Sequence, residues 1–461
     1  MYCGYVTTLK NVRQHPNADR MKLADCFGNT VCVDLNAVDG NVVIYFPTDG
    51  QLSAEYCTQN DLVRRKDENG NPCGGYLDPD KRNIRAIKLR GEKSDGLTMP
   101  LNSLAYTGID VLSLNVGDTI TVVNGHEICQ KYIPKTKNRE HGISSGGNKT
   151  RKRKAPIAPL FQEHADTEQL AYNLHAFKPG DEIEITLKMH GTSQRTGYLP
   201  TFQGYKRTFW DKIFRRPGVP VYDWDYVSGT RRVVLDTFDG GFYGSNEFRE
   251  QHTEVFKGKL WKGETVYYEV VGFTHTGTPI MASADNKKIS DKEFVKQYGA
   301  ETVFSYGCVP NTQWDITGDE DENGELPLLP VSDIYVYRMT MTNEDGNVVE
   351  YTPDFMRYRC EQMGVKTVPV FCKVVVTGGI DHNGCPYSVA DEVKELAERF
   401  YDGPDPIGKT HVREGVVVRI LNRPKFTAYK HKNFHFKVLE GIIKDTAEAP
   451  DMEEAQNVDS V

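Results

Sequence analysis

The pattern of apolar and polar residues changes along the chain and divides it into segments of different expected structure. Residues 1–125 carry short runs rich in Val, Ile, Thr, Tyr and Phe, such as TVCVDL and NVVIYF, separated by Gly, Asp and Asn. Runs of this length and composition, bounded by turn-forming residues, predict β-strands. We therefore expect residues 1–125 to form a small all-β barrel or sandwich.

A polar segment follows this first domain. Residues 126–159 include KYIPKTKNREHGISSGGNKTRKRK, which is rich in Gly and Ser and strongly basic. This composition is typical of an exposed interdomain linker. We interpret the charge run that contains Lys152, Arg153 and Lys154 as a solvated segment, and direct contact with phosphates is the alternative.

Residues 160–445 alternate between strand-like and helix-like segments. Two segments predict helices, DKEFVKQYG and VADEVKELAERFY, and the second has apolar residues at helical spacing. We expect this part of the chain to form an α+β domain. The last segment, 446–461, is acidic and poor in apolar residues, which predicts a disordered tail.

Composition limits the possible classes of protein. A chain of 461 residues favours two or three domains, and a formal net charge of -8 means that any nucleic-acid binding must come from local basic surfaces. Ten cysteines without a CxxC pair indicate reduced, structural thiols. Because the sequence has neither a long apolar run nor a secretory leader at its N-terminus, we expect a cytoplasmic protein without a membrane segment. Nothing indicates an obligate protein partner.

The segment EIEITLKMHGTSQR carries the central chemical signal. Its alternating apolar residues predict a strand that ends at Lys188 and turns at Gly191. A lysine amine becomes a nucleophile when desolvation or nearby positive charge lowers its pKa. The small Gly191, together with the hydroxyls of Thr192 and Ser193, would let a phosphate approach the strand end.

The KxxG pattern occurs four times, beginning at Lys88, Lys93, Lys188 and Lys296. The segment KSDGLT at Lys93 matches the KxDG consensus of covalent nucleotidyltransferases most literally. It lies in the β-rich N-terminal part, however, and lacks suitable partners at ordered distances downstream. We therefore predict that Lys188 is the nucleophile.

Lys188 is followed in order by SGTRRVVL, YYEVVGF, IYVYRM, REGVVVRI and YKHKNF. This order resembles the covalent nucleotidyltransferase superfamily of ligases and capping enzymes, over roughly residues 160–440. The match is closest to RNA ligases, whose KxHGT form is present here as Lys188, His190, Gly191 and Thr192. The resemblance implies an α+β adenylyltransferase domain, an ATP-grasp-like ligase fold, with these four residues at the nucleotide.

The resemblance also implies roles for residues of the middle motifs. Lys188 would attack the α-phosphate of ATP, and Arg231, or the neighbouring Arg232, would contact the nucleotide or the RNA 5′-phosphate. Glu269 would contact the ribose or a metal ion, and Tyr337 would stack on adenine. The alternatives are a solvated arginine, a surface salt bridge for Glu269 and a core position for Tyr337.

The last two motifs imply further charged groups around the phosphates. Glu414 matches the EG motif that helps to position a divalent cation, so Glu269 and Glu414 are the candidate metal ligands. Lys430 and Lys432 alternate on one predicted strand, point the same way and would face the phosphates. A common turn is the alternative for Glu414, and a solvated strand face is the alternative for the lysines.

Two positions depart from the family pattern. Many RNA ligases have glutamate immediately before the nucleophile, where this chain has Leu187. An acidic residue often follows the aromatic residue of the stacking motif, where this chain has Arg338. Both differences concern recognition of the adenine base.

The N-terminal and C-terminal parts also resemble a particular group of RNA ligases. Few residues follow Lys432, too few for the C-terminal OB domain of DNA ligases and capping enzymes. Instead, HPNADRMKLADC and IRAIKLRGEKSDGLTMPL resemble the OB-type module that precedes the catalytic domain in one group. Such barrels bind single strands through basic and aromatic residues, here Lys88, Arg90 and Lys93, although a solvated basic strand is an equal alternative.

An aromatic and basic segment, GYKRTFWDKIFRRPG, lies between Lys188 and Arg231. We expect one apolar helical face, surrounded by basic residues that contact RNA phosphates, with an amphipathic helix docked on the core as the alternative. The apolar residues are Phe209, Trp210, Ile213 and Phe214. The basic residues are Lys206, Arg207, Lys212, Arg215 and Arg216.

The sequence therefore predicts an ATP-dependent RNA ligase that joins 5′-phosphate and 3′-hydroxyl RNA ends through lysyl-AMP and RNA-adenylate intermediates. It would use ATP and a divalent metal, Mg or Mn, because a cation must offset charge on the transferring phosphates. The alternatives are a DNA ligase, an mRNA-capping-type guanylyltransferase and a catalytically inactive RNA-binding homologue. A nicked duplex, a single-stranded break and a cleaved tRNA all remain open as substrates.

Overall fold

A computed structural model describes most of the chain in two units. The described residues are 2–48, 50–66, 72–132, 155–164, 167–214, 218–231, 233–235, 238, 247–310, 329–380 and 386–440. One unit comprises Met1–Gly142, Asn286–Lys296 and Lys437–Val461, and the other comprises Ile143–Asp285 and Gln297–Phe436. The expected linker run at Lys152 and the acidic tail 446–461 lie outside the described residues.

The first unit consists mainly of short antiparallel strands. One sheet has the order β11-β5-β1-β12, and a second has the order β2-β3-β4. The short helix α1 begins after Ser53, whose side chain accepts a hydrogen bond from the Tyr56 backbone, and Tyr56 packs in a core with Val6, Ile44 and Phe46. The expected strands are therefore present. Among the described strands no closed ring is formed, and the OB-like barrel stays a prediction.

The bounds of the elements in this unit are as follows. The strands are β1 (Gly4–Thr8), β2 (Lys10–Gln14), β3 (Met21–Cys26), β4 (Asn29–Asp34), β5 (Val42–Phe46), β6 (Gly50–Leu52), β7 (Arg64–Lys66), β8 (Pro72–Gly74), β9 (Ala86–Leu89), β10 (Glu92–Asp95), β11 (Leu97–Pro100), β12 (Thr119–Ile120), β13 (Val122–Val123), β14 (His126–Glu127) and β15 (Cys129–Lys131). The helices are α1 (Ala54–Gln59) and the 3-10 turns η1 (Leu101–Thr107) and η2 (Val111–Ser113).

The second unit is built on two sheets. The five-stranded sheet has the order β16-β30-β29-β17-β26, and the larger sheet has the path β19-β18-β20-β23-β24, with β25 paired to β23. The strands of the first are β16 (Glu168–Gln169), β17 (Asp181–Leu187), β26 (Val370–Val376), β29 (Gly415–Ile420) and β30 (Thr427–Lys432). The strands of the second are β18 (Thr192–Lys206), β19 (Val219–Gly229), β20 (Glu264–Gly272), β23 (Ser332–Thr342), β24 (Val348–Glu350) and β25 (Lys366–Thr367).

The remaining elements of the second unit are short pairs and helices. The helices are α2 (Phe209–Ile213), α3 (Glu247–Glu254), α5 (Pro353–Met363), α6 (Val389–Phe400) and the 3-10 turns η3 (Leu170–Tyr172) and η4 (Leu174–Ala176). The short strands are β21 (Ala284–Asp285), β22 (Glu301–Thr302), β27 (Gly379–Ile380) and β28 (Pro386–Tyr387). Three further helices, η5 (Asn286–Lys288), α4 (Lys292–Tyr298) and α7 (Phe434–Leu439), lie at or across the division between the units.

Strand β17 separates a core face from a polar face in the five-stranded sheet. Ile183 and Ile185 are fully buried against α6, whereas Glu184 and Thr186 alternate with them and line a cavity on the other face. Helix α6 begins at a capping box between Ser388 and Asp391, which fixes its first turn. The helix expected from apolar spacing at VADEVKELAERFY is therefore confirmed, as is the strand that leads to Lys188, although it ends one residue earlier, at Leu187.

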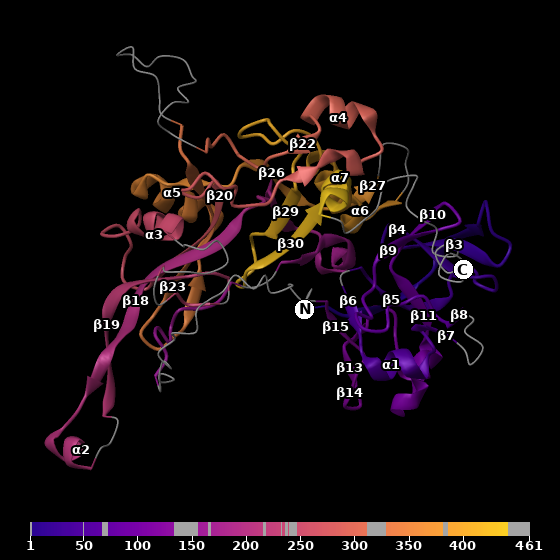
Figure 1. Ribbon diagram of the computed structural model, residues 1–461, viewed down its shortest axis with the longest axis horizontal. Coiled ribbons are helices and arrows are strands. Elements are labelled where there is room, and N and C mark those ends of the chain that lie inside the picture. The colour runs from indigo at the N-terminus through magenta and orange to yellow at the C-terminus, as the bar shows by residue number, and fades with distance from the viewer. Residues whose placement is uncertain are drawn as a thin grey trace. The chain divides into compact units, whose positions relative to one another are not determined.

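The larger sheet has a buried core of its own and a long hairpin that extends from it. Val266, Tyr268 and Val270 alternate along β20 and pack in one cluster with residues of α3 and α5. Strands β18 and β19 pair from Arg195 opposite Gly229 to Lys206 opposite Val219, and α2 lies at the end of this hairpin (Figure 1).

Candidate active site

A cavity of about 660 Å³ lies in the second unit and receives side chains from both of its sheets. Its volume is within the range that holds a nucleotide-sized ligand. The lining residues of the five-stranded sheet and its flanks include Glu184, Thr186, Lys188, Glu414, Val417, Arg419 and Ala428. Those of the larger sheet and its flanks include Thr192, Ser193, Arg231, Glu269 and Tyr337.

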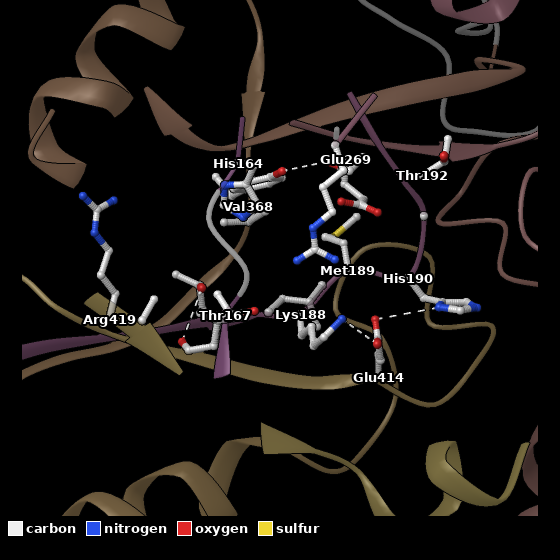
Figure 2. Close-up of a pocket in the computed structure, with 18 of the residues that line it drawn as sticks. His164, Thr167, Lys188, Met189, His190, Thr192, Glu269, Val368, Glu414 and Arg419 are labelled. Carbon is white, nitrogen blue, oxygen red and sulfur yellow. Dashed lines mark hydrogen bonds and ion pairs between the residues drawn. The ribbon is translucent and has the colours of Figure 1, made fainter. Parts of the chain in front are cut away.

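Lys188 directly follows β17 and is held at the cavity by Glu414. Its Nζ lies 2.5 Å from Oε1 of Glu414, and its backbone N–H donates to the carbonyl of Gly415 at 3.0 Å (Figure 2). The Nζ of Lys432 lies 3.2 Å from the same carboxylate oxygen. Burial opposes ionisation of Glu414, but the charges of Lys188 and Lys432 outweigh it and lower the pKa of this carboxyl to about 2. Glu414 is therefore an ionised carboxylate between two lysines.

Two motif positions must be glycine, because another part of the backbone lies too close to leave room for a Cβ atom. A Cβ atom at Gly415 would lie 2.1 Å from the carbonyl oxygen of His431, and its φ of +144° favours glycine. A Cβ atom at Gly191 would lie 2.4 Å from the carbonyl oxygen of Val270 and 2.8 Å from Cγ of Glu269. Gly191 therefore lets the turn after Lys188 lie directly against β20, and Gly415 lets Glu414 approach the lysines.

His190 packs among aromatic rings beside Lys188. Its ring lies 4.6 Å from Phe304 and 4.7 Å from Phe436, both edge-on, and its backbone N–H donates to the Tyr306 hydroxyl at 2.7 Å. Desolvation lowers the pKa of His190 to about 4, so the imidazole is neutral at pH 7. A neutral His190 holds the turn in place by packing and adds no positive charge for phosphates.

Glu269 on β20 is the second carboxyl of the cavity. Desolvation raises its pKa from 4.5 to about 7, and the charge of Glu414 adds to this effect, whereas Lys188 and Arg231 oppose it. The register of β18 and β20 places Glu269 opposite Ser193. The predicted residues Lys188, Arg231, Glu269 and Glu414 thus share one cavity.

Arg249 of α3 holds the strand that follows the nucleophile motif. Its Nη2 donates to Oγ1 of Thr192 at 2.6 Å, and its Nη1 donates to the carbonyl of Ser193 at 3.3 Å. The guanidinium is buried, so these bonds fix the start of β18 at the cavity. Arg249 and Tyr306 could not be identified from the sequence, because neither belongs to a recognisable local motif.

Tyr337 lines the cavity from β23. Its hydroxyl lies 2.9 Å from Oγ of Ser193, and its ring meets His164 edge-on at 5.1 Å. Tyr337 is therefore a cavity-lining residue, and its stacking on adenine stays a prediction. The neighbouring Arg338 pairs with Glu350 at 2.9 Å and lies behind the cavity-lining residues His164 and Phe426, at 3.4 Å from Nδ1 of His164 and 4.8 Å from the Phe426 ring.

The lysine pair lies on the cavity side of β30. Lys430 pairs with Val417 across the strands, and Lys432 pairs with Gly415. Because directly paired residues share a face of a sheet and Val417 lines the cavity, both lysine side chains start from the cavity face. This placement agrees with the expected common direction of the two side chains. Their contact with phosphates stays a prediction.

Two of the basic residues expected to contact RNA phosphates, Lys206 and Arg207, do not line the cavity. Lys206 and Arg207 are exposed at the far end of β18. The side chain of Lys212, and Arg215 and Arg216 entirely, lie outside what the structure describes, as do the side chains of Lys88 and Lys93. The alternative of a helix docked on the core is wrong, because Phe209 is 71% exposed and Trp210 is 63% exposed.

The donor atoms of the cavity suit a divalent cation. Among the residues that the structure describes, no hydrogen-bond partner meets the buried Oε2 atom of Glu414, and Glu269 presents a second carboxyl to the same cavity. Carboxylate oxygens are the ligands that Mg²⁺ and Mn²⁺ prefer. Glu269 and Glu414 could therefore hold such an ion.

No family model and no curated protein matches the sequence, whereas solved structures do. A lysine-to-alanine variant of Naegleria gruberi RNA ligase with ATP and Mn is 16% identical, has a TM-score of 0.52 and is aligned over 96% of this chain and 99% of that chain. An arginine-to-alanine variant of the same ligase with ATP and Mn is 15% identical, with a TM-score of 0.51 and coverage of 95% and 99%. A lysine-to-methionine variant with AMP and Mn is 15% identical, with a TM-score of 0.50 and coverage of 95% and 98%.

These similarities show a shared fold and confirm the mixed α+β class. They extend over nearly the whole of both chains, so they include the β-rich N-terminal part as well as the two sheets around the cavity. Within the described residues, no helix is both long and apolar enough to cross a bilayer.

Proposed function

We propose that this chain is an ATP-dependent RNA ligase that forms a covalent lysyl-AMP at Lys188. The observation that carries the proposal is the position of the Lys188 amine, which lies 2.5 Å from a buried carboxylate at a nucleotide-sized cavity, with Lys432 on the same carboxylate. The shared fold with an RNA ligase supports the proposal. ATP and Mn occur with that ligase, and we infer that ATP and a divalent metal, Mg or Mn, serve here.

In the first step Nζ of Lys188 attacks the α-phosphorus of ATP. A phosphorus–nitrogen bond forms, the bond from the α-phosphorus to the bridging oxygen breaks, and pyrophosphate leaves with that oxygen. The attacking amine must first lose its proton to solvent, because Glu414, whose pKa is lowered to about 2 by the adjacent lysines, is too weak a base to take it. Lys430, Lys432 and Arg231 would stabilise the negative charge that develops on the phosphates.

The second and third steps use the bound AMP to seal RNA. An oxygen of the RNA 5′-phosphate attacks the lysyl-AMP phosphorus and releases the Lys188 amine, which leaves an RNA-adenylate. The RNA 3′-hydroxyl then attacks the 5′-phosphate, loses its proton and expels AMP. Glu269 and Glu414 would hold the divalent ion, which supplies charge neutralisation at the transferring phosphate when it is bound.

The remaining cavity residues would position the nucleotide. Tyr337 offers a ring that its bond to Ser193 holds in place, which suits stacking on the base. Gly191, Thr192 and a neutral His190 would shape the turn at the phosphates. The N-terminal unit, as an OB-like module, would hold the RNA strand. We place the enzyme in the cytoplasm and its function in RNA repair.

Labelling with a nucleoside triphosphate tests this function. The protein is incubated with ATP or GTP labelled at the α-phosphate and a divalent metal, and then separated on a denaturing gel. We expect label from ATP and its transfer to 5′-phosphate RNA. Label from GTP alone would indicate a capping-type guanylyltransferase, transfer only to DNA would indicate a DNA ligase, and no label would indicate an inactive RNA-binding homologue.

A further inference from the structure

The tip of the β18–β19 hairpin, Lys206 to Phe214, is an exposed aromatic and basic surface. Helix α2 lies there, and a capping box between Thr208 and Asp211 fixes it (Figure 1). Its large apolar residues face outward, with 71% exposure for Phe209, 63% for Trp210, 52% for Ile213 and 60% for Phe214. The rings of Trp210 and Phe214 are stacked at 6.0 Å with an interplanar angle of 20°. Exposed apolar groups in this number mark an interaction site.

The charge of the tip is opposite to that of the whole chain. The segment 206–214 contains three Lys or Arg residues and one Asp, whereas the chain has a formal net charge of -8. Lys206 and Arg207 are exposed at the base of the tip. A local positive charge on an acidic protein selects an anionic partner.

We propose that the tip binds the RNA substrate far from the ligation point, an inference that rests on the proposed function. Trp210 and Phe214 stack on unpaired bases, and Lys206 and Arg207 contact the phosphates, which is the combination that binds single strands without reading sequence. A membrane surface is the less suitable partner, because the five residues of α2 are too short for a helix that lies in a bilayer interface.

Strand β18 joins the tip to the active site and sets the distance between them. Strand β18 begins at Thr192, which lines the cavity, and ends at Lys206 after 15 residues. At about 3.3 Å per residue this strand is roughly 45 Å long. Stacked nucleotides advance about 3.4 Å each, so roughly 13 nucleotides separate the two contacts. RNA strands shorter than this separation reach the cavity without contacting the tip.

Binding and sealing measurements test the proposal with matched variants. One variant removes the rings, Trp210→Ser with Phe214→Ser, and another reverses the charges, Lys206→Glu with Arg207→Glu. The control is Lys394→Glu with Arg399→Glu, which makes the same charge change on the exposed face of α6. If all three variants unfold at the same temperature as the wild type, their folds are intact and their affinities can be compared.

Fluorescence anisotropy with a labelled 30-nucleotide RNA measures affinity without requiring catalysis. We expect both tip variants to bind at least tenfold more weakly than the wild type. Stacking of a base on one ring is worth about that factor, and the charge reversal replaces two contacts to phosphates by repulsion. The control is expected to change affinity less than twofold. In sealing assays the KM should rise for 30-nucleotide strands and stay constant for 8-nucleotide strands.

Three outcomes would overturn the proposal. Wild-type affinity in the tip variants excludes RNA as the partner, and a loss of binding to anionic vesicles with unchanged RNA affinity indicates a membrane site instead. Equal changes in KM for both RNA lengths exclude a distant contact. A wild-type protein without adenylation would refute the proposed function, but the anisotropy comparison would still decide whether the tip binds RNA.

Discussion

Replacement of Glu269 by glutamine should stabilise the protein at alkaline pH while it removes activity. The pKa of Glu269 is raised from 4.5 to about 7, mainly because its carboxyl is desolvated. Between these values the native protein keeps the proton that the unfolded chain releases. Stability is therefore lost as pH rises from about 4.5 to 7, and above pH 7 the charged carboxylate costs about 3 kcal/mol at most.

Glu269→Gln keeps the size of the side chain and removes this cost. We expect its unfolding temperature to exceed that of the wild type by roughly 5 °C at pH 8.5 and to equal it at pH 4.5. Adenylation should fall sharply, since the variant lacks one of the two carboxylates assigned to the metal. Differential scanning calorimetry at the two pH values and label transfer from ATP measure both effects.

A matched control separates the local effect from general charge. Glu398→Gln makes the same chemical change on the exposed surface of α6, where Glu398 pairs with Lys394 at 3.8 Å. This control should shift the unfolding temperature little at either pH and leave adenylation unchanged. The reasoning is refuted if Glu269→Gln is less stable than the wild type at pH 8.5, or if its stability difference is the same at both pH values.

Three further predictions concern the site and the N-terminal unit. Glu414→Gln leaves two lysines around a neutral amide, so it should lower the free energy of unfolding by about 3 kcal/mol near pH 7. Denaturant titrations should show this difference shrinking as pH falls from 4.5 towards 2, where the wild-type carboxylate takes up its proton. Arg249→Ala should slow single-turnover adenylation about tenfold, because Thr192 loses a charge-assisted hydrogen bond at 2.6 Å. A Lys257→Ala control, at an exposed position shortly after α3, should leave the rate of adenylation unchanged. Removal of residues 1–130 should spare adenylation and weaken RNA sealing, and sealing at limiting RNA as fast as that of the full chain would contradict it.

Local sequence patterns were sufficient to predict the strand and the helix that follow from residue alternation and spacing. Alternation along EIEITL predicted the strand before Lys188, and apolar spacing predicted α6. The order of the motifs predicted that Glu269 and Glu414 would share a cavity with Lys188. These features depend on neighbours in the sequence or on a topology that the motif order encodes.

Features that depend on packing between distant segments could not be predicted. Arg249 reaches Thr192 from a helix 57 positions later, and Tyr306 reaches His190 across 116 positions. No local pattern marks either contact. The apolar face at Trp210 has the same periodicity whether its helix is docked or exposed, so only the structure distinguishes the two.

The central claim is that Lys188 carries AMP, and mapping the adduct tests it most directly. The wild type, Lys188→Ala and Lys93→Ala are incubated with ATP and a divalent metal, digested at a pH that preserves the phosphoramidate, and analysed by mass spectrometry. We predict an AMP adduct on the peptide that contains Lys188 in the wild type and in Lys93→Ala, and no adduct in Lys188→Ala. An AMP adduct that persists in Lys188→Ala, or that maps to another lysine of the wild type, would contradict the assignment.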